Sequence, residues 1–111
     1  MSEFQTVATI DEIPEGQGRA FEVDNRVIAI FNINGKFTAI DDMCPHMGAS
    51  LCEGAYDEKD STIACPLHGW RFNVFDGAWT DNPRIKTDVF EVRVVANEIQ
   101  VCTTPLKAEE N

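Results

Sequence analysis

Short apolar segments separated by turn-forming residues constrain the fold of this chain more than any other feature of its sequence. Turn-forming residues lie between such segments at Asp24-Asn25, Asn34-Gly35 and Asp76-Gly77, and a further turn is expected near Asn97. These residue types adopt a positive φ at low cost, as tight hairpin turns require. Helical periodicity is weak, and we expect helix only as a short turn around Thr9–Pro14. The sequence therefore predicts an all-β domain of short antiparallel strands.

The size and charge of the chain limit the number of domains and the classes of partner that it can bind. With 111 residues, 43% of them hydrophobic, the chain is long enough for one domain with a packed core. Its 19 acidic and 9 basic residues give a net charge of −10. Because phosphate groups would be repelled, this balance argues against nucleic acid and against an anionic membrane as partners. It is compatible with a basic protein partner, or with solubility alone.

Neither a membrane helix nor a secretion signal is visible in the sequence. No stretch approaches the roughly 20 apolar residues that a membrane helix needs. The N-terminus lacks a basic start followed by an apolar run. We therefore expect a cytoplasmic location, where metal ligation explains the four cysteines better than disulfides do.

Two short segments repeat the order cysteine, proline, histidine and contain both histidines of the chain. The pairs are Cys44 with His46 and Cys65 with His68, and 18 residues separate His46 from Cys65. Cysteine and histidine both bind transition metals, and each segment provides one of each. A Cys₂His₂ zinc finger instead groups its cysteines on one element and its histidines on another. The pattern therefore favours a binuclear centre over zinc or no metal, with both cysteines on one metal and both histidines on the other.

A cluster of two irons and two sulfides matches this pattern. Two ferric ions, two sulfides and four thiolates sum to a charge of minus two, whereas two imidazoles in place of two thiolates bring the sum to zero. An electron is added more easily to a neutral centre than to a dianion. We therefore expect a raised reduction potential, with the electron on the imidazole-bound iron.

The order Cys-x-His, 18 residues, Cys-x-x-His resembles the signature of the Rieske [2Fe–2S] family. The surrounding segments CPHMG and CPLHGWRF, the later FDG, and Pro83 extend the likeness over the whole chain. The resemblance implies a single Rieske domain with an antiparallel β-sandwich or barrel base at 1–41 and 83–105. A small cluster-binding subdomain would occupy about 42–80. It also implies one [2Fe–2S] cluster, with Cys44 and Cys65 on one iron and His46 and His68 on the other.

The resemblance is to the low-potential branch of this family. High-potential members carry an extra cysteine in each loop and hydroxyl donors beside the cluster. The motif places Ala49 and Leu67 at those cysteine positions, and Trp70 and Phe72 at the hydroxyl positions. The chain thus resembles soluble ferredoxins and oxygenase domains. Oxygenase large subunits bind a second iron through two further histidines, which this chain lacks, so we expect an electron carrier without catalysis of its own.

Three functions are compatible with such a carrier. The first is a ferredoxin that passes electrons from a flavin reductase to a terminal oxygenase. The second is the small subunit of an assimilatory NAD(P)H nitrite reductase, and the third is a non-redox interaction module on the same fold. Because all four ligand-type residues are present, we favour the first.

The remaining residues of interest surround the two pairs. We expect Cys52 and Cys102 to be buried free thiols on β elements, with a disulfide between them as the alternative. We expect Trp70 and Trp79 in the core or covering the cluster, and the turn at 57–60 in solvent. Electrons are expected to leave at the histidines, through an apolar tip formed by Met47, Gly48, Leu67 and Gly69. Acidic residues are expected further out, at Asp41, Asp42, Glu53 and the turn at 57–60.

Overall fold

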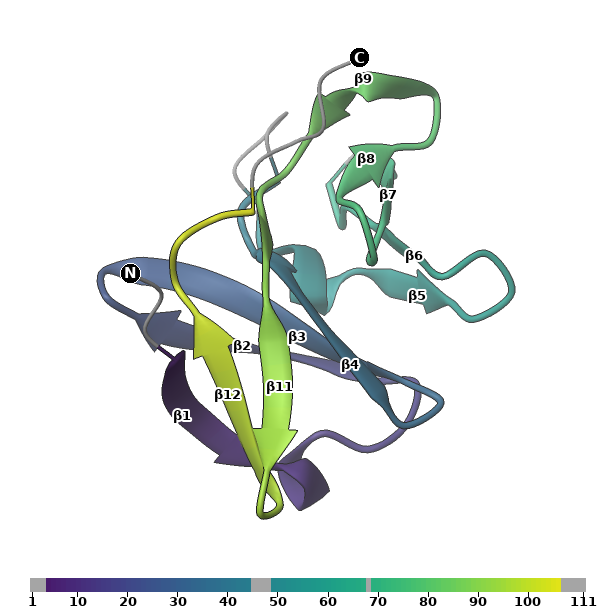
Figure 1. Cartoon of the computed structure of the whole chain (residues 1–111). Coiled ribbons are helices and arrows are strands. Elements are labelled where there is room, and N and C mark those ends of the chain that lie inside the picture. Colours follow the sequence, from purple (N-terminus) through teal and green to yellow (C-terminus); the bar gives the residue numbers. More distant parts are fainter. Residues whose placement is uncertain (1–3, 45–48, 68, 107–111) are drawn as a thin grey trace.

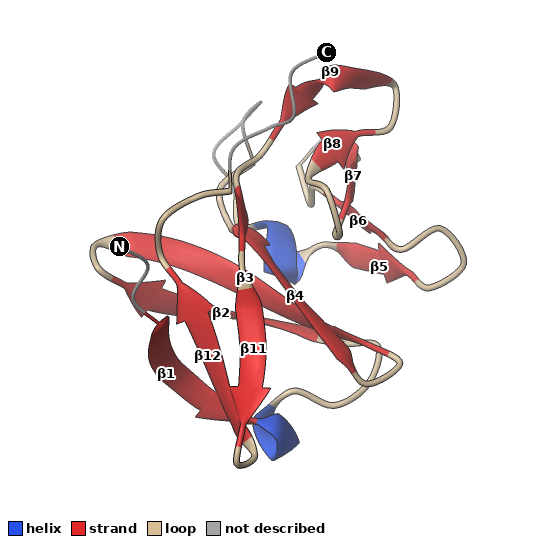
Figure 2. Ribbon diagram, viewed as in Figure 1, coloured by secondary structure: helices blue, strands red, loops and turns tan. Residues whose placement is uncertain are grey.

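A computed structural model of the chain describes residues 4–44, 49–67 and 69–106. Within these ranges the regular structure consists of β-strands and two short 3₁₀ helices, as Figure 2 shows. The prediction of an all-β fold is confirmed. His46 and His68 lie outside the described residues, as do Met47 and Gly48.

The strands form three antiparallel sheets. The first has the order β1 (Phe4–Thr9), β12 (Glu98–Cys102), β11 (Val92–Val95). The second has the order β10 (Val89–Phe90), β4 (Lys36–Asp41), β3 (Arg26–Ile33), β2 (Gly18–Val23). The third has the order β5 (Ala55–Asp57), β6 (Thr62–Ala64), β7 (Arg71–Asn73), β8 (Ala78–Trp79), β9 (Asn82–Lys86).

The first two sheets form a base, and the third lies at one end of it (Figure 1). The third sheet is called the smaller sheet below because it belongs to the smaller part of the domain, although it has five strands. Strand β9 belongs to the smaller sheet, which therefore extends past residue 80, where the sequence suggests that the subdomain ends. The connection from β9 back to the base passes through Thr87, which is buried. The Thr87 main-chain N–H donates to the carbonyl of Gly77 at 2.9 Å. This hydrogen bond ties the connection to the smaller sheet.

Strand β3 is shared between two hydrophobic cores because successive side chains of a strand point to opposite faces. Ile28 and Ile30 pack into the core between the two base sheets. Ala29, Phe31 and Ile33 pack into the second core, which also contains residues of the smaller sheet. A strand buried on both faces needs a nearly continuous apolar sequence, which explains the run of hydrophobic residues in β3.

Three of the predicted turns are two-residue hairpin turns. Both central residues have a positive φ in Asp24-Asn25 (52° and 66°), Asn34-Gly35 (54° and 89°) and Ala96-Asn97 (50° and 69°). The mirror-image turns that match the twist of β-hairpins require this conformation.

The predicted tight turn at Asp76-Gly77 is wrong in detail. Strand β7 ends at Asn73, whose side-chain oxygen accepts hydrogen bonds from the main-chain N–H groups of Phe75 and Asp76 at 2.7 and 3.1 Å. This side chain competes with strand pairing and opens a longer loop before β8. Gly77 has a φ of 74°, and a Cβ there would lie 2.5 Å from the Thr87 carbonyl oxygen, so only glycine fits.

The first 3₁₀ helix, η1 (Ile10–Glu12), confirms the predicted turn at Thr9–Pro14. The second, η2 (Leu51–Glu53), contains Cys52, so the prediction that Cys52 lies buried on a β element is wrong. Main-chain N–H groups of this segment donate to residues 42, 50 and 51, which gives a helical turn instead of a strand. Cys52 is half-buried in this turn. Cys102 is buried at the end of β12 as predicted, and both cysteines are free thiols.

Candidate metal centre

The two segments that share the cysteine–proline order form loops with the same closure. The main-chain N–H of Cys44 donates to the carbonyl of Ala49 at 2.8 Å, and that of Cys65 donates to the carbonyl of Trp70 at 2.7 Å. In each loop the cysteine is therefore bonded to the fifth residue after it. His46 and His68 each belong to the stretch that one of these bonds closes, although both lie outside the described residues.

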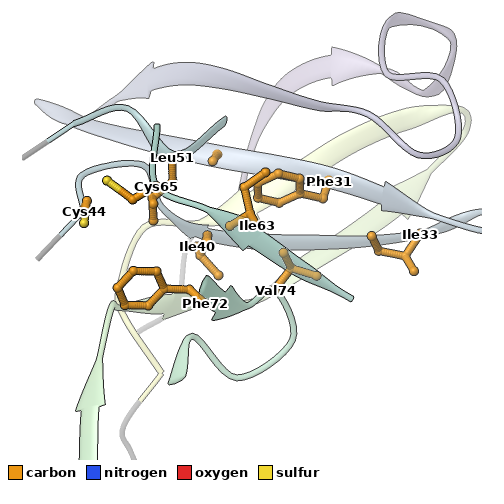
Figure 3. Packing of buried hydrophobic residues seen from close by; sticks show 10 residues of the cluster. Phe31, Ile33, Ile40, Cys44, Leu51, Ile63, Cys65, Phe72 and Val74 are labelled. Atoms are coloured by element: carbon orange, nitrogen blue, oxygen red, sulfur yellow. The ribbon is translucent and has the colours of Figure 1, made fainter. Parts of the chain in front are cut away.

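Cys44 and Cys65 lie in one hydrophobic core cluster at the end of the base that carries the smaller sheet. Their exposed fractions are 1% and 2%. Figure 3 shows both side chains at the same end of this cluster, with Leu51 close by. Two sulfur ligands from two loops are thus gathered in a water-poor place, which fits a pair of thiolates on one iron.

The carboxylate of Asp42 holds the residues that follow the first loop. Its two oxygens accept hydrogen bonds from the hydroxyl of Ser50 at 2.5 Å and from the main-chain N–H of Cys52 at 2.9 Å. Its own main chain donates to the carbonyl of Val27 at 3.0 Å and accepts from the N–H of Leu51 at 2.7 Å. Asp42 therefore joins the base strand to both ends of the first loop.

The prediction that Asp42 belongs to an acidic outer surface is wrong. Its exposed fraction is 5%, because the carboxylate is turned inward onto the loop that it closes. The neighbouring Asp41 is half-buried and forms one ion pair with Arg26, which also pairs with Asp88. Sequence reasoning missed the role of Asp42 because nothing in the sequence distinguishes two adjacent aspartates.

The second loop is supported by aromatic side chains. The rings of Trp70 and Trp79 stack with centroids 3.6 Å apart and an interplanar angle of 5°. Trp70 also meets the ring of Phe72 at 6.4 Å, and Phe72 is fully buried. Both indoles are half-buried and pack against the core cluster that contains the two cysteines, so they cover this core from its edge.

The thiol of Cys52 is held in its neutral form. Burial raises the pKa of this thiol, and the nearby negative charge of Asp42 adds to the rise, while the hydroxyl of Ser50 at 3.4 Å opposes it. Cys52 packs against the same core cluster, but it lies on η2, outside the two loops that share a main-chain closure.

Two large apolar side chains are exposed beside the cysteines. Met43 precedes Cys44 and is 62% exposed, and Leu67 follows Cys65 by two residues and is 58% exposed. Gly69 has a φ of 78° and its N–H donates to the carbonyl of Cys65. Of the predicted apolar tip, the described part is therefore exposed as expected.

No helix among the described residues is long and apolar enough to cross a membrane.

A family model, related sequences and solved structures all match the family that the sequence resembles. Residues 3–103 match the family model of the Rieske [2Fe-2S] domain. The ferredoxin component of the alkene monooxygenase system of Xanthobacter autotrophicus is 29% identical over 107 residues, which cover 96% of this chain and 87% of the relative. The ferredoxin of carbazole 1,9a-dioxygenase from Nocardioides aromaticivorans is 34% identical, with a TM-score of 0.84 over 90% of this chain and 97% of that one.

A third similar structure comes from another kind of system. It is described as an NADH-dependent nitrite reductase small subunit from Mycobacterium tuberculosis. Its TM-score is 0.85 at 23% identity, over 96% of this chain and 99% of that one. At that identity the likeness concerns the fold alone.

Proposed function

The chain belongs to the Rieske [2Fe-2S] domain family, and we propose that it passes single electrons from a flavin-dependent reductase to a terminal oxygenase. One [2Fe–2S] cluster per chain supplies the one-electron chemistry. The relatives that support the oxygenase as acceptor are ferredoxin components of an alkene monooxygenase system and of carbazole 1,9a-dioxygenase.

We propose Cys44 and Cys65 as the ligands of one iron, and His46 and His68 as the ligands of the other. The single observation that carries the proposal is the burial of both cysteines at the same end of one core, on loops with identical closure. The histidines are assigned from their order in the sequence and from the family match over 3–103. In this assignment the core shields the thiolate side of the cluster from water.

We also propose that the chain catalyses no reaction on a substrate by itself. A mononuclear oxygenase iron is held by two histidines and a carboxylate. The sequence contains two histidines, and the cluster takes both in this assignment.

The cytoplasm is the proposed location of the protein. The free thiols of Cys52 and Cys102 fit its reducing conditions.

The nitrite reductase small subunit is the alternative acceptor system. Its support is the shared fold of the Mycobacterium tuberculosis structure. The second alternative is a non-redox interaction module, which would use the fold only as a scaffold. The presence of all four ligand-type residues favours the electron carrier over both.

Reconstitution of electron transfer tests the proposal. The purified protein should contain about two irons and two acid-labile sulfides per chain, as a Rieske centre does. It should be reduced by a flavin reductase and NADH, and should then be reoxidised by an oxygenase in the presence of substrate and oxygen. One zinc without sulfide would refute the cluster. Reoxidation by a sirohaem nitrite reductase, but not by an oxygenase, would establish the alternative system.

A further inference from the structure

We infer that the buried charge of Asp42 lowers the reduction potential of the cluster, while its hydrogen bonds position the loop that carries Cys44. This inference rests on the proposed assignment of Cys44 as a ligand. It makes Asp42 a positioning residue that acts on the cluster through the first loop and through its electric field.

Asp42 is a charged group with polar but uncharged hydrogen-bond donors. Its carboxylate accepts from the hydroxyl of Ser50 and the N–H of Cys52, and no ion pair to Asp42 is formed among residues 4–44, 49–67 and 69–106. Asp41, the preceding residue, has Arg26 at 3.3 Å, and Asp88 shares this cation at 3.0 Å. The two aspartates thus differ in the property that decides how far their fields reach, since an adjacent cation weakens the field of a negative charge.

Asp42 stands near the proposed ligand in the sequence, and its charge is buried. Only Met43 separates it from Cys44, and the side chain is turned into the protein with 5% of its surface exposed. Charges in such surroundings are screened by water much less than charges on the surface. A negative charge there opposes the arrival of an electron, so it lowers the potential.

The position before the second loop that matches Asp42 carries no charge. Two residues before Cys65 stands Ile63, an apolar side chain that is 1% exposed. The closing main-chain hydrogen bonds of the two loops are equivalent, so loop closure by itself does not need a carboxylate at this position. The negative charge is therefore a separate feature of the first loop, with an effect that its removal can reveal.

The test compares two substitutions that change the net charge equally. Asp42→Asn keeps the size of the side chain and removes the buried charge, and Asp41→Asn removes the charge that is paired with Arg26. Voltammetry of the cluster-loaded proteins should show reduction favoured about tenfold more in Asp42→Asn than in the unmodified protein, which is 59 mV for a one-electron couple. Asp41→Asn should change this equilibrium less than twofold. Equal potentials in Asp42→Asn and the unmodified protein, or equal shifts in both variants, would overturn the inference.

Ser50→Ala separates charge from loop geometry, and it decides the matter if Asp42→Asn fails to retain the cluster. It removes one hydrogen bond of the first loop but leaves the carboxylate, which loses a donor that partly neutralises it. A potential at or below that of the unmodified protein supports the inference, and a rise refutes it. Iron and sulfide analysis of the unmodified protein comes first, because a missing cluster would refute the proposed function instead.

Discussion

The two loops that begin at Cys44 and Cys65 share their main-chain closure and differ in what supports it. The first loop closes over the hydrogen-bonded carboxylate of Asp42, whereas the second is supported by the stacked indoles of Trp70 and Trp79. A carboxylate contributes a charge and directional bonds, and an indole pair contributes apolar surface that excludes water. We expect the first support to act mainly on the reduction potential and the second mainly on retention of the cluster.

The two cysteines of the loops differ from the other two cysteines of the chain in their position, not in being buried. Cys44 and Cys65 lie together at one end of a core, and Cys102 is also buried, on β12 in the base. Burial by itself therefore does not make a cysteine a ligand. Position on an equivalent loop is the property that the two proposed sulfur ligands share.

The largest expected effect is loss of the cluster on removal of a ligand of the second loop. Cys65→Ala and His68→Ala should each leave the protein without a stable cluster, because one iron then lacks a ligand. Cys52→Ala is the matched control and should retain about two irons and two sulfides per chain. Iron and sulfide analysis with visible absorption measures the outcome. A fully loaded Cys65→Ala variant, or an empty Cys52→Ala variant, would mean that the sulfur ligands are misassigned.

The next effect concerns the aromatic support. Trp79→Ala removes the partner of Trp70 and part of the packing against the core, at a cost of about 2 kcal/mol in the free energy of unfolding, below the value for fully buried tryptophan. If this cost falls on the cluster-loaded state, loss of absorbance in the presence of a chelator should become about 30-fold faster, since each 1.4 kcal/mol is a factor of ten. The potential should stay close to that of the unmodified protein. A large shift in potential without faster cluster loss would reverse the division between the two loops.

Sequence reasoning reached the fold and expected Trp70 and Trp79 in the core or covering the cluster, but it missed the role of Asp42 and the stacking of the two indoles. The hairpin turns follow from residues such as Asn34 and Gly35, whose conformational preferences are local and therefore readable in the sequence. The role of Asp42 depends on Ser50 and Cys52, which reach it only after the chain has folded back. The Trp70–Trp79 stack joins the end of the second loop to β8, and the early end of β7 depends on the side chain of Asn73.

A third effect concerns the exposed end of the second loop. Leu67→Glu should slow electron exchange with the reductase about tenfold at every ionic strength, because it places an unpaired charge in the expected contact with the partner. Val94→Glu is the control, since Val94 is also exposed but lies on β11 in the base (Figure 1). It should leave the rate unchanged in stopped-flow measurements.

Salt dependence distinguishes contact from attraction at this surface. Since Asp42 is buried and Asp41 is paired with Arg26, the acidic residues left to attract a basic partner are exposed ones such as Glu53. Raising the salt from about 0.02 to 0.5 M, where the Debye length falls below about 5 Å, should slow the unmodified protein and Leu67→Glu by similar factors. If Leu67→Glu had no effect while removal of Glu53 had a large one, exit of the electron at the histidine end would be refuted.

The smallest expected effect comes from adding a hydroxyl beside the cysteines. Phe72 is fully buried in the core cluster of Cys44 and Cys65, at a position where the family's high-potential branch has a hydroxyl donor. Phe72→Tyr should favour reduction by about threefold, or roughly 30 mV for one electron, if the new O–H reaches a sulfur. Phe31→Tyr is the matched control, because it adds the same group to the same cluster but lies well away from Cys44 in Figure 3. A shift in both variants would point to a general change in the polarity of the core. Without a shift in Phe72→Tyr, the potential would depend on charge, as inferred for Asp42, more than on hydroxyl donors near the second loop.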